Sequence, residues 1–269
     1  LCVQNELFMF EKEIKAYEEV LKAYRQKVTD RMALADLREY NEILFSAHSC
    51  AIEGNSFSVN DTRELKEKGL NVIPQGKTLF EAFEMLDHFR AYEYLLNQPE
   101  APLSEELLKE THRILMEHTL SYRYPDAKAG EYTTTDMCAG DTIFGEHEQL
   151  IGRVPQLLSS TQQAMEEGKI HPMILSARFH GFYEYLHPFR DGNGRIGRLF
   201  SNFILHKAGH PIIIITKEKK DEYINALRYI RTERTDEHLI AFFFQTAIER
   251  MQREIDEKRK QSITFPFLF

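Results

Sequence analysis

Residues 187–198 read His-Pro-Phe-Arg-Asp-Gly-Asn-Gly-Arg-Ile-Gly-Arg, and no other stretch of the 269-residue chain concentrates so many chemically useful side chains. Gly192 and Gly194 give this loop two positions that are free to adopt positive φ. The loop runs directly into a helical pattern over about 194–207. Backbone N–H groups at such a turn, together with the positive end of the helix dipole, form a site for anions.

The side chains around this loop fit phosphate chemistry. Arg195 and Arg198 are three residues apart, so we expect their guanidinium groups to share one helix face and reach over the same loop. Asp191 is a hard oxygen ligand of the kind that holds Mg²⁺ beside substrate phosphates. His187, which ends the preceding helix before Pro188, belongs to the residue type that acts most often as general base. Together they predict phosphoryl or nucleotidyl transfer to a hydroxyl group.

Residues 187–198 resemble the Fic motif, H-P-F-x-D/E-G-N-G-R-x-x-R, and agree with it at every specified position. Taken alone, a glycine-rich loop is usually an ordinary turn, and a histidine before proline is usually only a helix end. Average residue usage, however, puts a chance match to the whole motif below about 10⁻¹⁰ per starting position. The resemblance implies a mainly α fold, a Fic-type helical bundle with a small β-hairpin flap. It also implies transfer of AMP from ATP to a Ser, Thr or Tyr hydroxyl of a protein, with Mg²⁺ as cofactor and with auto-modification.

The same resemblance implies a role for each residue of the motif. His187 would deprotonate the target hydroxyl, and Asp191 would hold Mg²⁺. The residues implied to bind the ATP phosphates are Gly192, Asn193, Gly194, Arg195 and Arg198, of which Arg198 would hold the terminal phosphate. Tyr223 lies where an aromatic residue of the adenine pocket is expected, and packing in the core is an equally good interpretation of it.

The stretch 130–145 differs from its helical surroundings because several glycines punctuate it and threonine and aromatic residues are frequent. This composition predicts two short strands, Tyr132–Met137 and Thr142–Phe144, that form a hairpin. Through the resemblance this hairpin becomes a flap that holds the target peptide by strand addition. The docking residues would be Thr134, Thr135, Asp136, Met137 and Cys138. Thr133 stands where many members of the family have arginine.

A third stretch, Ser49-Cys50-Ala51-Ile52-Glu53-Gly54-Asn55, has a plain interpretation as a solvated glutamate before a glycine that ends a helix. It also resembles the inhibitory helix of many Fic proteins, here about residues 40–54, with Ser49, Glu53 and Gly54 as its signature. The resemblance implies that Glu53 pairs with Arg198 and fills the pocket of the terminal phosphate. Because the pattern precedes the motif, the chain resembles the class whose inhibitory helix is N-terminal to the core.

Other functions stay open at this stage. In one, Glu53 positions a water that removes AMP from a modified protein. In another, the donor is a different nucleotide or a phosphocholine carrier. In a third, the chain is a non-catalytic nucleotide-sensing module, and the helical segment 217–261 and the closing residues 265–269 dock a partner or form a homodimer.

Composition limits the classes of partner. The chain has 34 basic and 42 acidic residues, a net charge of −8 and a pI near 5.8, which disfavours a nucleic-acid binder. No apolar run approaches the roughly 20 residues that span a bilayer, so no membrane partner is expected. Three widely spaced cysteines and a start without the pattern of a signal peptide favour a reducing cytoplasm.

Most of the chain has helical periodicity, and three regions follow one another without a linker. The expected regions are an N-terminal helical region over 1–100 that includes the inhibitory helix, a Fic core over 101–210, and C-terminal helices over 211–269 that pack on the core. The expected helices cover about 5–28, 31–53, 78–96, 147–167, 172–186, 194–207, 217–232 and 236–261, and a further helix begins behind its cap Ser104.

Overall fold

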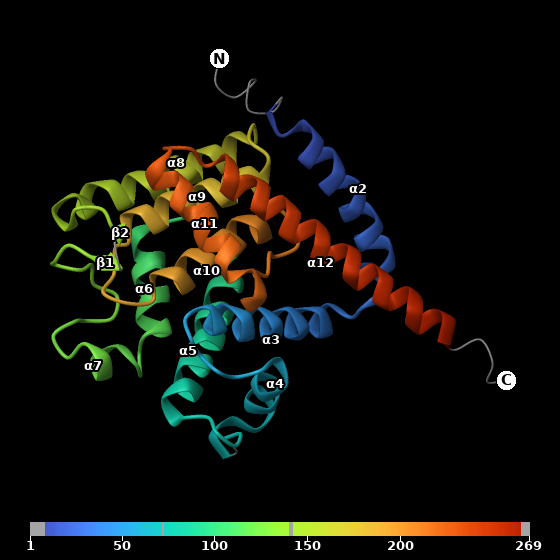
Figure 1. The fold of residues 1–269 in the computed structure, drawn as a ribbon, viewed down its shortest axis with the longest axis horizontal. Helices are drawn as coiled ribbons and strands as arrows, with labels where there is room; N and C mark the ends of the chain where they lie inside the picture. The colour runs from blue at the N-terminus through green and yellow to red at the C-terminus, as the bar shows by residue number, and fades with distance from the viewer. Residues whose placement is uncertain (1–8, 72, 140–141, 265–269) are drawn as a thin grey trace.

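The computed structural model describes residues 9–71, 73–139 and 142–264, and most of them are helical (Figure 1). This confirms the predicted mainly α fold. The α-helices are α2 (Glu11–Lys27), α3 (Leu34–Ile52), α4 (Val59–Lys68), α5 (Leu79–Leu96), α6 (Glu105–Leu115), α7 (Leu120–Arg123), α8 (Leu150–Glu167), α9 (Pro172–Leu186), α10 (Asn193–Lys207), α11 (Lys220–Thr232) and α12 (Glu237–Thr264). Short 3-10 turns cover Thr29–Arg31, Gly69–Asn71, His147–Gln149 and Lys217–Lys219.

The helix that the motif opens, α10, lies in the middle of the molecule (Figure 1). Ile196, Leu199, Phe200 and Phe203 are all buried, and α10 packs along α9. Nearly every residue of this helix is buried, including its two arginines, so α10 is a central helix of the fold. Both ends of the motif loop are therefore anchored in rigid structure.

The first and last described helices lie side by side, with α2 along the long α12 (Figure 1). Tyr17, Leu21 and Tyr24 of α2 are buried in one apolar cluster with Phe243 and Phe244 of α12. This packing confirms the periodic apolar positions that predict the first helix. The predicted start of that helix at residue 5 and the closing segment 265–269 lie outside the described residues.

Helices α3, α4 and α5 form the lower part of the view in Figure 1 and enclose a smaller apolar cluster. Helix α4 was not predicted, although Ser58 and Asp61 form a capping box at its start. Helix α3 begins at Leu34, later than the predicted residue 31, because Thr29–Arg31 form a separate 3-10 turn and Ala33 is the residue before the helix. The predicted capping box of Thr78 precedes α5 as expected.

The predicted hairpin is shorter than expected. Strand β1 (Cys138–Ala139) pairs antiparallel with β2 (Thr142–Ile143), with Cys138 opposite Ile143. The predicted first strand over Tyr132–Met137 is wrong, because the side chains there bond locally: Thr133 Oγ1 donates to the Thr135 carbonyl, and Asp136 accepts from the His147 N–H. Such bonds compete with a strand ladder. The turn residues 140–141 lie outside the described residues. Within the described ranges, every helix is too short or too polar to cross a bilayer.

Candidate active site

The loop between α9 and α10 is fastened by one of its own side chains. His187 has a left-handed backbone with φ 50°, and Gly192 has φ 78°, so the chain reverses between the two helices. Asn193 Oδ1 accepts a hydrogen bond from the Phe189 N–H at 2.9 Å, and Asn193 Nδ2 donates to the Phe189 carbonyl at 2.6 Å. The side-chain amide of Asn193 thus ties the two ends of the loop together through Phe189.

The first turn of α10 offers backbone N–H groups to an anion. No side chain caps this helix, which leaves its first N–H groups available. The carboxylate of Glu53 lies against Gly194, since a Cβ added to that glycine would be 2.4 Å from Glu53 Oε1. The helix dipole favours negative charge at this place. Glu53 therefore stands where the sequence predicts a phosphate group.

The end of α3 binds the guanidinium group of Arg198 through several bonds. Arg198 Nη2 donates to Glu53 Oε1 at 2.7 Å and to the Ser49 carbonyl at 2.9 Å, and its Nε donates to Ser49 Oγ at 3.0 Å. Burial alone would lower the pKa of Arg198, but the Glu53 carboxylate outweighs this and raises the pKa above its ordinary value. Gly54, with φ 103°, turns the chain away directly after Glu53. The predicted contact between Glu53 and Arg198 is thus present in the structure.

The two arginines of the motif have different partners. Arg195 is buried, and its Nη1 and Nη2 lie 3.5 Å from Glu84 Oε1 and 3.5 Å from Asp191 Oδ1. Arg198 instead points toward the end of α3. Both guanidinium groups border the motif loop, Arg195 at Asp191 and Arg198 beside Gly194, and acidic side chains on α5 and at the end of α3 pair with them.

Glu84 of α5 is a site residue that the sequence analysis missed. Besides Arg195, its carboxylate lies 3.3 Å from Arg123 Nη2 and accepts a hydrogen bond from Asn55 Nδ2 at 3.2 Å. It therefore connects the segment after the inhibitory helix to the motif. The signal that could have found it is weak: an acidic residue between Ala82 and Met85, two core positions of the same helix.

His112 of α6 is a second residue that the sequence analysis missed. Its Nδ1 accepts a hydrogen bond from the Gly130 N–H at 2.8 Å, so its Nε2 carries the proton and donates to the Asp191 carbonyl at 3.0 Å. The ring stacks on Phe189 with centroids 3.7 Å apart. Burial lowers the pKa of His112 to about 4. A neutral histidine thus connects the start of the flap to the motif loop.

Asp191 fits a site for a divalent cation beside phosphates. Its carboxylate is partly exposed, and its contacts with Arg123 at 3.3 Å and Arg195 at 3.5 Å are longer than the 2.7–2.9 Å typical of charge-assisted hydrogen bonds. Only the bond from the Gly192 N–H, at 2.6 Å, is short. Oxygen ligands of this kind suit Mg²⁺, which usually takes one or two carboxylates together with substrate phosphates.

His187 lies in a cavity of 410 Å³ that it shares with Glu53, Gly194 and Arg198. Phe144, which follows strand β2, stacks on the His187 ring with centroids 3.7 Å apart and planes 16° apart. The histidine ring is therefore held in one plane by the flap. The structure brings together the predicted base, the anion site and the residues of the inhibitory helix.

Tyr223 of α11 lies in the wall of the same cavity, together with Ile224 and Leu227. Its ring is also part of the apolar core, and its hydroxyl is 2.6 Å from His180 Nε2. Both interpretations of this residue from the sequence, a pocket wall and a core residue, are compatible with its place.

The flap residues lie at the surface beside this cavity. Thr134, Thr135, Asp136 and Cys138 are exposed and Met137 is half-buried. The flap is joined to the motif loop by the Thr133 N–H, which donates to the Pro188 carbonyl at 2.8 Å. Among the described residues, no strand pairs with Thr134–Asp136, and the Thr133 hydroxyl bonds to both the carbonyl and the N–H of Thr135.

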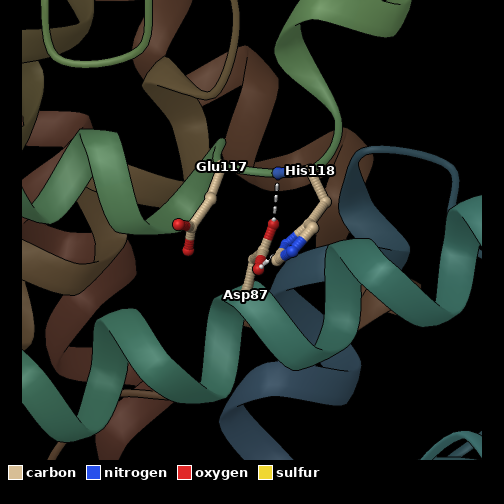
Figure 2. Close-up of side chains that lie close together, drawn as sticks. All are labelled: Asp87, Glu117 and His118. Carbon is tan, nitrogen blue, oxygen red and sulfur yellow. Dashed lines mark hydrogen bonds and ion pairs between the residues drawn. The ribbon is translucent and has the colours of Figure 1, made fainter.

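A second cluster of charged side chains, Asp87, Glu117 and His118, has ligand atoms within 4.8 Å of one another (Figure 2). Asp87 accepts hydrogen bonds from the His118 backbone N–H at 3.0 Å and from His118 Nδ1 at 2.8 Å. Arg90 pairs with both carboxylates, at 3.4 Å from Asp87 Oδ1 and at shorter distance from Glu117. A guanidinium group already neutralises these acids, so we interpret the cluster as a structural tie between α5 and the end of α6.

Comparison with known proteins agrees with this geometry. Residues 102–205 match the Fic/DOC family model. The chain is 32% identical over 188 residues to the protein adenylyltransferase Fic of Culex quinquefasciatus, an alignment that covers 67% of this chain and 35% of that protein. The chain belongs to the Fic/DOC family.

Solved Fic structures have the same fold. A Fic domain containing signaling protein from Bacteroides thetaiotaomicron superposes with a TM-score of 0.79 at 22% identity, over 91% of this chain and 97% of that one. Fic-1 from C. elegans gives a TM-score of 0.75 at 23% identity, over 96% of this chain and 76% of that one. The chain spans only 35% to 42% of the length of the curated Fic relatives from Culex quinquefasciatus and Drosophila grimshawi.

Proposed function

We propose that this Fic protein is a protein adenylyltransferase whose ATP site is kept closed by Glu53. The observation that carries the proposal is the 2.7 Å ion pair between Glu53 and Arg198 at the uncapped start of α10. A terminal phosphate of ATP needs the same guanidinium group and the same N–H groups, so it competes with Glu53. Relatives named protein adenylyltransferase support this reaction.

Once the phosphate site is free, the residues of the cavity have distinct roles in AMP transfer. His187 takes the proton from the target hydroxyl, whose oxygen bonds to the α-phosphorus while the bond to pyrophosphate breaks. The backbone N–H groups of Asn193 and Gly194 stabilise the negative charge on the phosphate, and Arg198 holds the terminal phosphate. Asp191 would hold Mg²⁺, which when bound neutralises part of the charge on the ATP phosphates.

The acceptor in this proposal is a protein that docks on the flap. Residues 134–138 lie at the surface, where a peptide could add as a strand by replacing the bonds of the Thr133 hydroxyl to Thr135, and the flap reaches the catalytic histidine through Phe144. A peptide held there would place a hydroxyl-bearing side chain near His187. Because strand addition uses backbone bonds, the enzyme's own exposed segments are further acceptors, and auto-modification is expected.

The proposal is tested by incubating the protein with labelled ATP and Mg²⁺. Glu53→Gly should raise auto-modification at least about tenfold. In the wild type Glu53 displaces the terminal phosphate of ATP, and a displacement of roughly 1 Å at a reacting group costs about 10²-fold in rate. Adding His187→Ala should abolish the label. Glu233→Gly is the matched control, since Glu233 is also an exposed glutamate at a helix C-cap, that of α11. Mass spectrometry identifies the donated group. Unchanged labelling of Glu53→Gly would contradict the proposed inhibition.

The position of Glu53 also supports a second activity, the removal of AMP from a modified protein. Its carboxylate is 37% exposed and lines the same cavity as His187, so it can hold a water next to a bound AMP ester. Incubating the AMP-modified Glu53→Gly protein with fresh wild type separates the two roles. Release of AMP by the wild type but not by the variant would assign hydrolysis to Glu53.

A further inference from the structure

Glu184 of α9 is a buried carboxylate in an unfavourable place. It lies in the last turn of the helix, where the dipole disfavours negative charge. It is 9% exposed, and its Oε1 has no hydrogen-bond partner. A buried acid without full hydrogen bonding is costly, so its retention needs a reason outside helix stability.

The other oxygen of Glu184 faces His187. Glu184 Oε2 lies 3.6 Å from His187 Nδ1, and this ring nitrogen is itself buried without a hydrogen-bond partner. Two unpartnered polar atoms of complementary type thus face each other just beyond hydrogen-bond distance. Catalytic hydrogen bonds are often this long before substrate binds. With Nδ1 turned to Glu184, Nε2 is the nitrogen left for the target hydroxyl.

Space for this carboxylate comes from Gly197, in the middle of α10. A Cβ on Gly197 would lie 2.8 Å from Glu184 Oε1 and 2.8 Å from His180 Nδ1. A glycine inside a helix costs roughly 1 kcal/mol relative to alanine. The missing side chain therefore marks a place where α10 must approach an acid and an imidazole closely.

The charged surroundings favour the ionised form of Glu184. His180 faces it from its own helix, Arg198 from α10, and Tyr223 and Arg231 from α11, where Arg231 Nη2 also donates to the Glu184 carbonyl at 2.6 Å. Burial alone would raise the pKa of Glu184, but the nearby His187, His180 and Arg198 outweigh it and lower the pKa.

We propose that Glu184 is a positioning residue that holds His187 in the tautomer with its proton on Nδ1, so that Nε2 is presented as the base. This inference rests on the proposed AMP transfer and deepens it. The proton of the target hydroxyl goes to His187 Nε2, and the Glu184 carboxylate stays ionised and stabilises the imidazolium that forms. The new ester bond and the loss of pyrophosphate are those of the proposed reaction.

The first test does not depend on activity. Nitrogen-15 NMR of the full chain, with the His187 signals assigned by comparison with His187→Ala, reads the tautomer and the protonation midpoint of His187 directly. The wild type should show the Nδ1–H tautomer. In Glu184→Gln the midpoint should move to lower pH, because a neighbouring negative charge has been removed. An Nε2–H tautomer in the wild type, or an unmoved midpoint, would overturn the proposal.

The second test uses the Glu53→Gly background. Glu184→Gln should lower kcat about 10- to 100-fold, leave the KM for ATP within about twofold, and move the acidic limb of the pH profile to lower pH. Glu254→Gln is the control for neutralising a buried carboxylate, since Glu254 is buried in α12 away from the cavity, and its profile should not move. If the Glu53→Gly protein transfers no AMP while the NMR result holds, the proposed function fails and the placement of His187 stands.

Discussion

At the scale of single residues, Gly194 decides what can occupy the start of α10. A Cβ there would lie 2.4 Å from Glu53 Oε1 and 3.0 Å from Arg198 Nη1. The space beside Gly194 is therefore filled by the Glu53 carboxylate, or by a phosphate that replaces it. On the Glu53→Gly background, we expect Gly194→Ala to weaken ATP binding at least about tenfold and to lower AMP transfer about 100-fold, because the phosphate is displaced by about 1 Å. Calorimetry and labelling measure the two effects.

The control for Gly194→Ala is Gly152→Ala, because Gly152 is also a helical glycine but has open space where the methyl group would be placed. That substitution should leave binding and transfer unchanged and raise stability slightly. If Gly194→Ala behaved like this control, the anion would not bind where Glu53 now lies.

The sequence predicted the residues of the loop well, because a contiguous motif encodes them within twelve positions. It missed Glu84, His112 and Glu184, which come from three different helices. Each is a single polar residue inside an otherwise ordinary helical pattern. Only the packing of α5, α6 and α9 around α10 shows that they face the site.

At the scale of elements, His112 joins α6 to the flap and to the motif loop, and this connection makes stability depend on pH. Burial holds the pKa of His112 at about 4, below its value of about 6.5 in the unfolded chain. Between these values the unfolded chain binds a proton that the folded chain does not. The contribution of His112 to the free energy of unfolding should therefore be fully present above about pH 6.5. It should be lost as the pH falls toward 4, which lowers the free energy of unfolding by up to about 3 kcal/mol.

Urea denaturation between pH 7 and pH 4.5 measures this effect. His112→Gln should be less stable at pH 7, since it loses the bonds to Gly130 and Asp191, but its stability should fall less steeply with acid. The other buried histidines are present in both proteins, so their contributions cancel. Parallel curves would contradict the assigned role of His112.

The elements themselves were predicted best where a cap and a periodic pattern agree, as for α5 behind Thr78 and α6 behind Ser104. The flap was predicted least accurately, because threonine raises strand propensity and also bonds to its own backbone. In 132–137 the local bonds of Thr133 and Asp136 prevail, and the ladder begins only at Cys138.

At the scale of the whole molecule, we propose that the three expected regions unfold together. Helix α2 from the N-terminal region packs along α12 from the C-terminal one, and α3 brings Glu53 to the motif arginine Arg198. Contacts between distant segments of this kind could not be predicted from the sequence, because periodicity identifies an apolar face without naming its partner. The packing of α2 on α12 depends on a polar cluster around Arg250.

Arg250 of α12 is buried where α12 packs against α2, and it is the central residue of that polar cluster. Its Nε donates to Glu254 Oε1 at 2.8 Å and its Nη1 to the Ile212 carbonyl at 2.7 Å, while Tyr24 of α2 donates to Glu254 Oε2 at 2.7 Å. Removing the arginine leaves a buried carboxylate without its cation. We expect Arg250→Met to lower the free energy of unfolding by about 3–5 kcal/mol.

Urea denaturation followed by circular dichroism measures the loss in Arg250→Met. Because the cost comes from the unpaired acid, adding Glu254→Gln should recover part of the stability, whereas Arg253→Met, an exposed position of the same helix, should change it by less than about 0.5 kcal/mol. One transition that shifts as a whole supports cooperative unfolding of the three regions. A separate early transition in Arg250→Met, with the rest of the curve unmoved, would instead show that α2 and α12 unfold apart from the Fic core.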